Sequence, residues 1–374
     1  MEEAGTQLCI DREGLENSEH MKKNSAGMKH RSPLADMEEE KALDLLMDKY
    51  GTNRAYTRHY LKHITACHLD NPNFDLYLDS ELGSLKRSRS FLKSLSESLG
   101  DQGLFRGTRC LDIGCAAGNS LIAFVEEGAA QATGIEIDRG RYETALINID
   151  GCDEEVRDRI RILHSDIESD EITDIGRFDV TFCNDVLEHV RDPEWAIGQI
   201  CRLMKSTEGA FAFVNLRNYL NPANVMTEPH YGMPAMVLLP PELAAEYYNL
   251  CRVDTSLPYE VRYWMSFDEY RSLFETQGKQ CAFYCVSRPD ESCIDHIEYQ
   301  SRQVSPAFRR FCEAHSVHRT LKETIEDYIG EYVLRIARDV REYRARRDEA
   351  LLLRFYLNYV VFDIVMIITN KEVT

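Results

Sequence analysis

The sequence predicts an α/β protein with a mostly parallel sheet that holds a ligand where its strands end. A short apolar run at residues 108–113 is typical of a buried parallel strand. The spacing of the apolar residues then changes from that of a strand to that of a helix, because Leu121 and Phe124 fall on one face of a helix. Between strand and helix stand Gly114 and Gly118, which let the backbone turn tightly and approach a ligand closely.

The chemistry of this turn narrows the class of ligand. Asp112 stands where the strand ends, and we expect Asn119 or Ser120 to cap the following helix. A dinucleotide-binding turn carries three glycines as GxGxxG and aims a helix N-terminus at a pyrophosphate. Here cysteine and alanines replace the middle glycine, and an acid precedes the first one. The turn therefore favours a cationic ligand without phosphate.

Composition agrees with an intracellular protein that binds a small molecule. The chain has 374 residues and a formal net charge of -19, which repels a phosphate backbone, so we expect no nucleic-acid partner. The 12 cysteines include no CxxC pair, so we expect reduced thiols and neither disulfides nor a zinc site. No targeting peptide is visible, and the apolar C-terminal stretch is too interrupted to span a membrane. The expected location is cytoplasmic.

Several further segments occur in a specific order along the chain. After LDIGCAAGNS, GIEID and HSDI follow a second and a third expected strand. FDVTFCNDVLEHVRDP is a fourth strand that runs into a polar segment, and GAFAFVNL supplies a fifth strand. Together they resemble the motifs of the class I S-adenosylmethionine (SAM) dependent methyltransferases of the small-molecule type. The resemblance implies a Rossmann-like, seven-stranded, mostly parallel sheet whose last strand is antiparallel, with an N-terminal helical cap and a helical insertion before that last strand.

The same resemblance implies the residues that bind the cofactor. Glu136 matches the acid that accepts hydrogen bonds from the ribose hydroxyls, a strong and oriented contact for a carboxylate. Asp166 matches the contact to the adenine amine, with Ile167 beside the ring. The full set of cofactor-binding residues implied in this way is Asp112, Gly114, Cys115, Ala116, Gly118, Glu136, Ile137, Asp166, Ile167, Asn184 and Asp185.

The N-terminal part is expected to be a tail followed by helices. Residues 1–36 are polar and weakly periodic, which predicts a disordered tail, with a partner-binding arm as the alternative. Residues 37–103 are helical in pattern and form the predicted cap, which a helix over 82–99 closes. Tyr60 lies on an aromatic stripe of this cap. Core packing is the plain interpretation of the stripe, and contact with the acceptor is the alternative.

Two histidines are candidates for catalysis. His230 is the preferred general base, because a near-neutral histidine can remove a proton from an acceptor hydroxyl during methyl transfer. His189 lies in the NDVLEHV segment with Glu188, where a satisfied histidine and a solvated acid are the plain alternatives. Tyr231 and Met233 are expected to bind the acceptor together with Tyr60. We assign no metal, although Asp185, Glu188 and His189 offer ligands that leave a divalent ion open.

The remaining elements follow the core, which is expected over 104–287. A helix at 264–278 and a strand at 280–286 come before a helical insertion at 288–352, in which residues 317–349 are amphipathic over their whole length. The final strand and C-terminus occupy 353–374, with the strand itself expected at 360–369. We expect the long helix to pack on its own domain. The alternatives are that it covers the active site, pairs in a homodimer or binds another protein.

The predicted function is methyl transfer from SAM to a small-molecule acceptor, most simply a hydroxyl, by an in-line SN2 displacement. Two alternatives belong to other classes. One is a non-catalytic binding module that keeps the fold, against which the intact Asp112, Gly118 and Glu136 argue. The other is a nicotinamide-dependent oxidoreductase, against which the missing GxGxxG argues.

Overall fold

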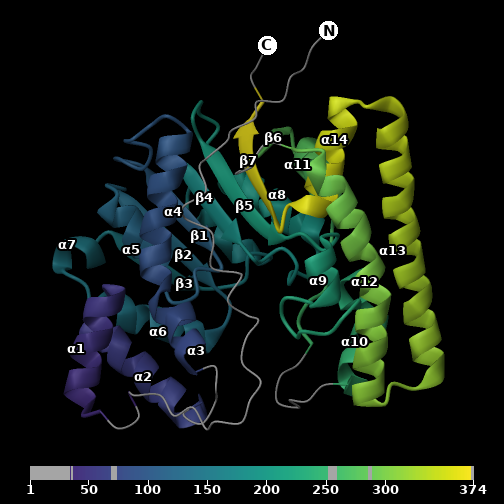
Figure 1. Ribbon diagram of the computed structural model, residues 1–374. Coiled ribbons are helices and arrows are strands. Elements are labelled where there is room, and N and C mark those ends of the chain that lie inside the picture. The colour runs from purple at the N-terminus through teal and green to yellow at the C-terminus, as the bar shows by residue number, and fades with distance from the viewer. Residues whose placement is uncertain (1–33, 35–36, 69–73, 252–258, 285–288, 372–374) are drawn as a thin grey trace. The chain divides into compact units, whose positions relative to one another are not determined.

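The computed structural model describes residues 34, 37–68, 74–251, 259–284 and 289–371. They form two compact units (Figure 1). The N-terminal unit holds the described residues up to Cys183 together with Arg202–Ala212. The C-terminal unit holds Asn184–Cys201 and the described residues from Phe213 onward. The predicted tail lies outside the described residues, apart from Leu34.

One sheet of seven strands has the order β3-β2-β1-β4-β5-β7-β6, with six parallel strands and one antiparallel strand. This confirms the predicted fold class. In the N-terminal unit the strands are β1 (Arg109–Ile113), β2 (Gln131–Glu136), β3 (Ile160–His164) and β4 (Val180–Asn184). The helices before β1 are α1 (Glu39–Tyr50), α2 (Arg54–His68), α3 (Phe74–Leu82) and α4 (Ser84–Ser98). Those after β1 are α5 (Asn119–Glu126), α6 (Arg139–Asp150), α7 (Glu154–Arg157) and the 3-10 helix η3 (Asp170–Asp174).

The register of the parallel strands gathers their carboxyl ends at one edge. β1 pairs with β2 so that Asp112 lies opposite Gly134, and β2 pairs with β3 so that Glu136 lies opposite His164. Gly134 has a steric reason to be glycine, because an added Cβ would lie 2.5 Å from the Cys115 sulfur. β2 and the turn after β1 are therefore in close contact, and this contact positions Glu136 at the end of β2.

The N-terminal helices pack on the turn after β1. Ala117 is buried in the same hydrophobic cluster as residues of α1, α2 and α3. The Asn148 amide donates to the Ala117 carbonyl at 2.8 Å and to Asn119 Oδ1 at 3.0 Å. The expected capping of α5 by Asn119 or Ser120 is wrong, because the N-cap is Gly118 at φ 74° and no side chain caps the helix there. Asn119 instead links the turn to α6.

The C-terminal unit carries the other side of the sheet and a long helical hairpin. Its elements are α8 (Pro193–Leu203), β5 (Phe211–Arg217), α9 (Pro222–Met226), η4 (Met236–Leu238), α10 (Pro241–Cys251), α11 (Phe267–Thr276), β6 (Lys279–Phe283), α12 (Ser292–His315), α13 (Arg319–Arg346), α14 (Glu349–Phe355), the π-helix η5 (Tyr356–Val360) and β7 (Asp363–Asn370). β7 pairs antiparallel with β6. The two helices of the hairpin, α12 and α13, lie side by side in Figure 1 and in their contacts. No helix among the described residues is long and apolar enough to cross a bilayer.

A predicted boundary in this unit needs correction. Of the strand expected at 280–286, β6 covers residues up to Phe283, and residues 285 and 286 lie outside the described residues. The strand expected at 360–369 begins only at Asp363. The delay has a structural cause, because Tyr356–Val360 continues α14 as a π-helical turn. The long amphipathic helix is present as α13 and ends at Arg346.

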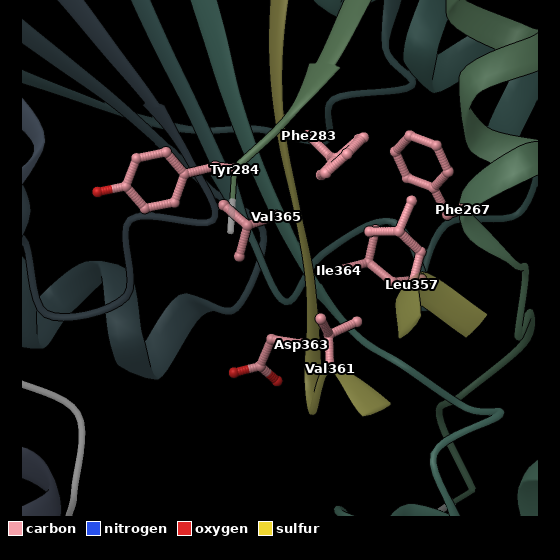
Figure 2. Close-up of a pocket in the computed structure, with 8 residues that line it drawn as sticks. All are labelled: Phe267, Phe283, Tyr284, Leu357, Val361, Asp363, Ile364 and Val365. Atoms are coloured by element: carbon pink, nitrogen blue, oxygen red, sulfur yellow. The ribbon is translucent and has the colours of Figure 1, made fainter. Parts of the chain in front are cut away.

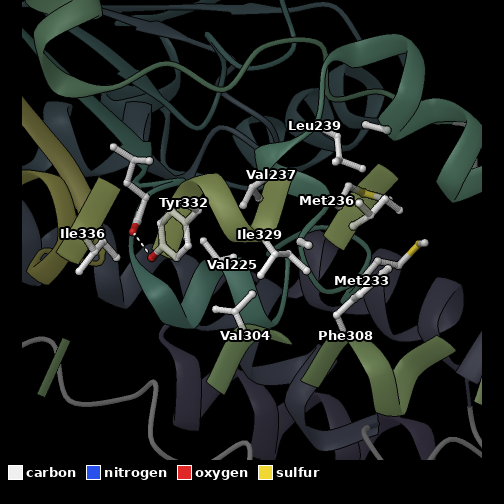
Figure 3. Packing of buried hydrophobic residues seen from close by; sticks show 14 of the residues in the cluster. Val225, Met233, Met236, Val237, Leu239, Val304, Phe308, Ile329, Tyr332 and Ile336 are labelled. Atoms are coloured by element: carbon white, nitrogen blue, oxygen red, sulfur yellow. Dashed lines mark hydrogen bonds between the residues drawn. The ribbon is translucent and has the colours of Figure 1, made fainter. Parts of the chain in front are cut away.

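The hairpin buries one face of each helix against the segment that follows β5. Figure 3 shows Val304 and Phe308 of α12 and Ile329 of α13 meeting Met233 and Met236 of that segment. Tyr332 is buried too, and its hydroxyl donates to the Leu220 carbonyl at 2.8 Å. The Asn, Pro and Gly residues of the segment after β5 predict a long loop from the sequence alone. The segment contains α9, η4 and α10 instead, because its apolar residues belong to this core.

Asparagines after β5 hold the end of the π-helix. The Asn218 side-chain amide donates to the carbonyls of Leu357 and Val361 at 3.0 and 2.8 Å. Asn221 and Asn224 donate in the same way to the carbonyls of Val360 and Phe362. Carbonyls at the end of a helix have no partner within the helix, so these side chains supply the missing donors. Residues that look like loop formers in sequence therefore fix β7 beside β5.

Candidate functional site

The turn after β1 is built from left-handed backbone. Gly114, Ala116 and Gly118 have φ values of 73°, 46° and 74°. The Gly114 and Cys115 amides both donate to the Ile135 carbonyl, at 2.8 and 3.1 Å. Alternating left-handed residues curl the chain back on itself and bring its amides toward the end of β2.

Glu136 is the carboxylate on which this turn closes. It is buried at the end of β2, where Oε2 accepts a hydrogen bond from the Ala116 amide and Oε1 accepts one from the Asp138 amide, both at 2.8 Å. Two oxygens of a carboxylate offer about four acceptor positions. Glu136 therefore keeps acceptor capacity for a ligand after it has oriented the turn.

Asp112 is the second buried acid of the turn. Its carboxylate accepts a hydrogen bond from the Ser120 hydroxyl. Burial and the charge of Glu136 raise the pKa of Asp112 to about 7, against the opposing effect of the Ser120 hydrogen bond. A cation placed here would favour the ionised form, because opposite charges stabilise each other strongly where water is excluded.

The ends of β2 and β3 leave an apolar surface beside these acids. Ile137 is 63% exposed, whereas Ile167 is buried. The His164 Nε2 donates to the Ile137 carbonyl at 3.1 Å, and the His164 ring stacks on Tyr142 at a centroid distance of 5.1 Å. Asp166 Oδ1 accepts from the Glu168 amide at 2.9 Å, which fixes the turn after β3.

In the C-terminal unit the NDVLEHV segment forms a strained turn after β4. Asp185 has φ 51°, and its amide donates to the Asn215 carbonyl at 2.9 Å. The Glu188 carbonyl accepts from the amides of Arg262 and Tyr263, at 2.8 and 3.1 Å. The backbone of this segment is thus held from both sides, which directs its side chains reproducibly.

Glu188 is buried, and its carboxylate has no hydrogen-bond partner among the described residues. It is only 2% exposed, and both carboxylate oxygens lack a partner there. The plain interpretation of Glu188 as a solvated acid is therefore wrong. Burial, assisted by the charge of Asp185, raises the pKa of Glu188 to about 7. A buried acid without a protein donor is expensive, so this group points to a ligand or to a protonated side chain.

We expect Glu188→Gln to change how the stability of the protein depends on pH. An acid whose folded pKa exceeds its unfolded value contributes stability that is full below the unfolded pKa and is lost as pH rises through the folded pKa. A rise from 4.5 to about 7 corresponds to about 3 kcal/mol. Thermal unfolding of both proteins between pH 5 and 8, with chelator present, should show Glu188→Gln gaining stability relative to wild type as pH rises. If the stability of the two proteins changed with pH in the same way, Glu188 would not be a buried acid with a raised pKa.

His230 is oriented by a buried carboxylate that sequence reasoning missed. The Glu228 side chain is 1% exposed, and its oxygens accept from the His230 amide at 2.9 Å, from the Tyr231 amide and from His230 Nδ1 at 2.8 Å. A carboxylate only accepts, so Nδ1 carries the proton and Nε2 is left as the basic nitrogen. Burial lowers the pKa of His230, but Glu228, with the charges of Glu188 and Asp185, raises it above the ordinary value.

A second histidine and a tryptophan complete this cluster. The rings of His189 and His230 meet edge to face at 5.0 Å, and the Trp264 ring lies 5.7 Å from His230. His189 Nδ1 donates to the Glu260 carbonyl at 3.3 Å. The buried Trp264 Nε1 has no acceptor among the described residues. The Trp264 indole and the Glu188 carboxylate both lie near His230 and both lack a partner among the described residues, so either could bind a polar group of a ligand.

The same cluster could hold a metal. Glu188, His189 and His230 each offer one ligand atom, and these atoms lie within 4.8 Å of one another. Two imidazoles and a carboxylate suit zinc or another transition metal. In such sites the imidazole nitrogen that does not bind the metal usually donates to a carbonyl or a carboxylate. The sequence offered Asp185 as the third ligand, whereas the structure brings His230 into that place.

Arg217 is the cation of this region. Its guanidinium donates to Asp363 at 2.7 Å and lies 3.9 Å from the Asp185 carboxylate. Asp363 also borders a small pocket with Tyr284 and Val361, shown in Figure 2. The pocket has a volume of about 10 Å³, which holds at most one water. It is therefore a packing defect beside β7 and not an acceptor site.

The predicted acceptor residues lie in different surroundings. Tyr231 packs against Tyr248 and Tyr259 at ring distances of 4.5 and 5.5 Å, and its hydroxyl accepts from the Glu260 amide. Met233 is buried in the core shown in Figure 3, so we leave it out of the site. Tyr60 belongs to the N-terminal unit, where it packs against Tyr56.

The comparisons with known proteins agree with the predicted family. Residues 85–282, more than half of the chain, match the model of the methyltransferase domain family, and the chain belongs to that family. This is the family that the sequence motifs predicted, that of the class I SAM-dependent methyltransferases.

Curated relatives include ubiquinone biosynthesis O-methyltransferases. That of Psychrobacter cryohalolentis is 28% identical over 116 residues, which cover 31% of this chain and 44% of the relative. That of Vibrio parahaemolyticus serotype O3:K6 is 31% identical over 121 residues, which cover 32% of this chain and 49% of the relative. The chain thus spans less than half the length of these two relatives.

Solved structures of low sequence identity are also similar. The YcgJ protein of Bacillus subtilis is 13% identical, with a TM-score of 0.40 over 77% of this chain and 99% of that chain. Magnesium protoporphyrin IX methyltransferase of Synechocystis PCC 6803 is 13% identical, with a TM-score of 0.37 over 59% of this chain and 84% of that chain. At these scores the similarity carries no functional argument.

Proposed function

We propose that this methyltransferase transfers the methyl group of SAM to a hydroxyl of a small-molecule acceptor. The observation that carries the proposal is the Glu228–His230 pair, in which a buried carboxylate accepts from Nδ1 and leaves Nε2 as a base. Such a base is useful when the acceptor atom must lose a proton, as a hydroxyl does. The name of the curated relatives, O-methyltransferases of ubiquinone biosynthesis, supports the same acceptor class.

In this proposal SAM binds on the turn after β1. The ribose hydroxyls donate to the remaining acceptor positions of Glu136, and adenine lies on the exposed Ile137 near Asp166 and Ile167. The ammonium of the methionine part lies near Asp112, whose buried carboxylate suits a cation. Backbone groups of Cys115, Ala116 and Gly118 contact the cofactor.

The acceptor is held and deprotonated by the C-terminal unit. Its hydroxyl donates to His230 Nε2, and a second polar group of the acceptor pairs with Glu188 or with the Trp264 indole. As the new carbon–oxygen bond forms and the carbon–sulfur bond breaks, the hydroxyl proton passes to His230. The Glu228 carboxylate stabilises the imidazolium that results. The sulfonium supplies the electrophile, so the protein contributes positioning and proton removal.

A metal-assisted reaction is the second candidate, because Glu188, His189 and His230 converge. A divalent ion bound there would lower the pKa of a coordinated acceptor hydroxyl. It would also take up the nitrogen that the first proposal uses as a base. The two candidates therefore differ in one measurable property, the dependence of turnover on metal.

Methyl-labelled SAM incubated with the protein and a panel of phenols, sugars and carboxylic acids tests the proposal. We expect label in the ether product of a hydroxyl acceptor, identified by mass spectrometry, and unchanged turnover after dialysis against a chelator. Loss of turnover on chelation, with recovery on adding Zn²⁺ or Mn²⁺, supports the metal candidate instead. SAM binding by calorimetry without any labelled product would indicate a non-catalytic module.

A further inference from the structure

A groove between α12 and α13, bordered by the exposed residues Gly330 and Leu334 of α13, is not used by the proposed function. The groove has a volume of about 410 Å³ and lies along the hairpin. Its lining from α13 is largely apolar, whereas α12 contributes polar side chains; the lining residues are Arg302, Ser305, Arg309, Glu326, Ile329, Gly330, Val333 and Leu334. Leu334 is 67% exposed, which is unusual for a leucine on a helix already packed on its other face.

Gly330 lies in this groove, in the middle of a 28-residue helix. A Cβ added there meets nothing within 4 Å, so no packing inside the chain requires glycine. Glycine within a helix costs about 1 kcal/mol relative to alanine. The missing side chain leaves space for a side chain from outside, one turn away from the exposed Leu334.

Charge is distributed along the outer face of α13 in a self-complementary way. At about 3.6 residues per turn, Glu323, Gly330, Leu334 and Arg341 lie on one side of the helix. On this side, the half before Gly330 carries the acids Glu323, Glu326 and Asp327 and one base, Arg319, which pairs with Glu323, and the half after Leu334 carries the bases Arg338 and Arg341. Except for Glu326, which is partly buried, these charged side chains are exposed.

We infer that this face binds α13 of a second copy of the chain, with the two helices antiparallel. A two-fold axis beside residue 332 places Leu334 of each copy over Gly330 of the other. The same register places Arg338 opposite Glu326 and Arg341 opposite Glu323. Every match occurs twice, as an isologous interface requires. A uniformly acidic or basic partner would not satisfy both halves of the face, so charge complementarity selects a second copy.

Charges already paired within the chain are compatible with this arrangement. Glu323 accepts from Arg319, and Glu326 accepts from Arg309 across the hairpin. A carboxylate can accept from two guanidinium groups, so the partner's arginines extend these pairs into networks. Exposed pairs are worth little singly, so the apolar contact of Leu334 over Gly330 supplies most of the affinity and the charges set the direction.

The first test uses the full chain in sedimentation velocity and native mass spectrometry. We expect a dimer for wild type and a monomer for Leu334→Glu. Leu45→Glu is the matched control, because Leu45 is also an exposed helical leucine, at 50%, but lies on α1. It should remain a dimer. A monomeric wild type overturns the inference, as does a Leu334→Glu protein that dimerises like wild type.

Charge reversal tests the register. Glu323→Arg places two arginines opposite each other in the homodimer, and Arg341→Glu places two glutamates opposite each other. Each variant alone should dimerise at least about tenfold more weakly than wild type. Mixing the two variants restores both opposite-charge pairs, so native mass spectrometry should show the heterodimer in preference to either homodimer. A statistical mixture of dimers, or no heterodimer, would overturn the antiparallel register.

Discussion

Replacing His230 with alanine is expected to lower kcat for a hydroxyl acceptor by about 10² to 10⁴, the usual contribution of a general base. The affinity for SAM should not change, because His230 is not among the proposed cofactor residues. Wild-type turnover should rise with pH through a pKa above the ordinary 6.5 of histidine, since Glu228 stabilises the protonated form and only neutral His230 accepts a proton. In His230→Ala this limb of the pH profile should disappear.

Two further variants separate a chemical role of His230 from a structural one. Glu228→Gln keeps the shape of the side chain, but its amide can donate to Nδ1 and so favours the tautomer with the proton on Nε2. We expect turnover to fall while SAM binding persists. His296, exposed on α12, is the matched histidine control, and His296→Ala should behave like wild type. Full turnover in His230→Ala, with wild-type thermal stability, would exclude His230 as the general base.

The fold could be predicted because its signals are local. The change from strand to helix period around Gly114 and Gly118 requires no knowledge of distant residues, and the structure has left-handed backbone at both glycines. The segments at the other strand ends are recognised in the same way. Parallel pairing then brings Glu136 to the edge of the sheet where β1 also ends. Boundaries near the C-terminus failed, because a π-helical turn held by distant asparagines follows α14.

The C-terminal cluster was only half visible in the sequence. His230 stood out as a histidine in an aromatic segment, but Glu228 two residues earlier looked like an ordinary loop acid. Its role depends on burial, which only the packing of the chain determines. Glu188 shows the same limit, because a pattern cannot tell a solvated acid from one whose carboxylate has no donor. The spacing GluProHis was the one available signal, since a carboxylate at that distance can reach its neighbour's backbone amide.

Asp112 leads to a prediction about cofactor binding. Because burial and Glu136 raise its pKa to about 7, the carboxyl of the ligand-free protein is largely protonated at pH 6 and largely ionised at pH 8. Only the ionised form attracts the ammonium of the methionine part. Below pH 7 the affinity for SAM should therefore rise with pH, by up to about tenfold for each pH unit. Above about pH 7 it should level off. Isothermal titration calorimetry across pH 5.5 to 8.5 measures this directly.

Asp112→Asn is the variant that attributes the pH dependence to this group. The amide oxygen still accepts from Ser120, so the local structure should be kept while the charge is removed. We expect SAM to bind about tenfold to a hundredfold more weakly at pH 8, since hydrogen bonds to charged groups contribute about 1.5 to 3 kcal/mol. The affinity should also become nearly independent of pH. A variant that keeps the wild-type pH dependence would show that another group titrates, and that Asp112 serves only to hold Ser120 and the start of α5.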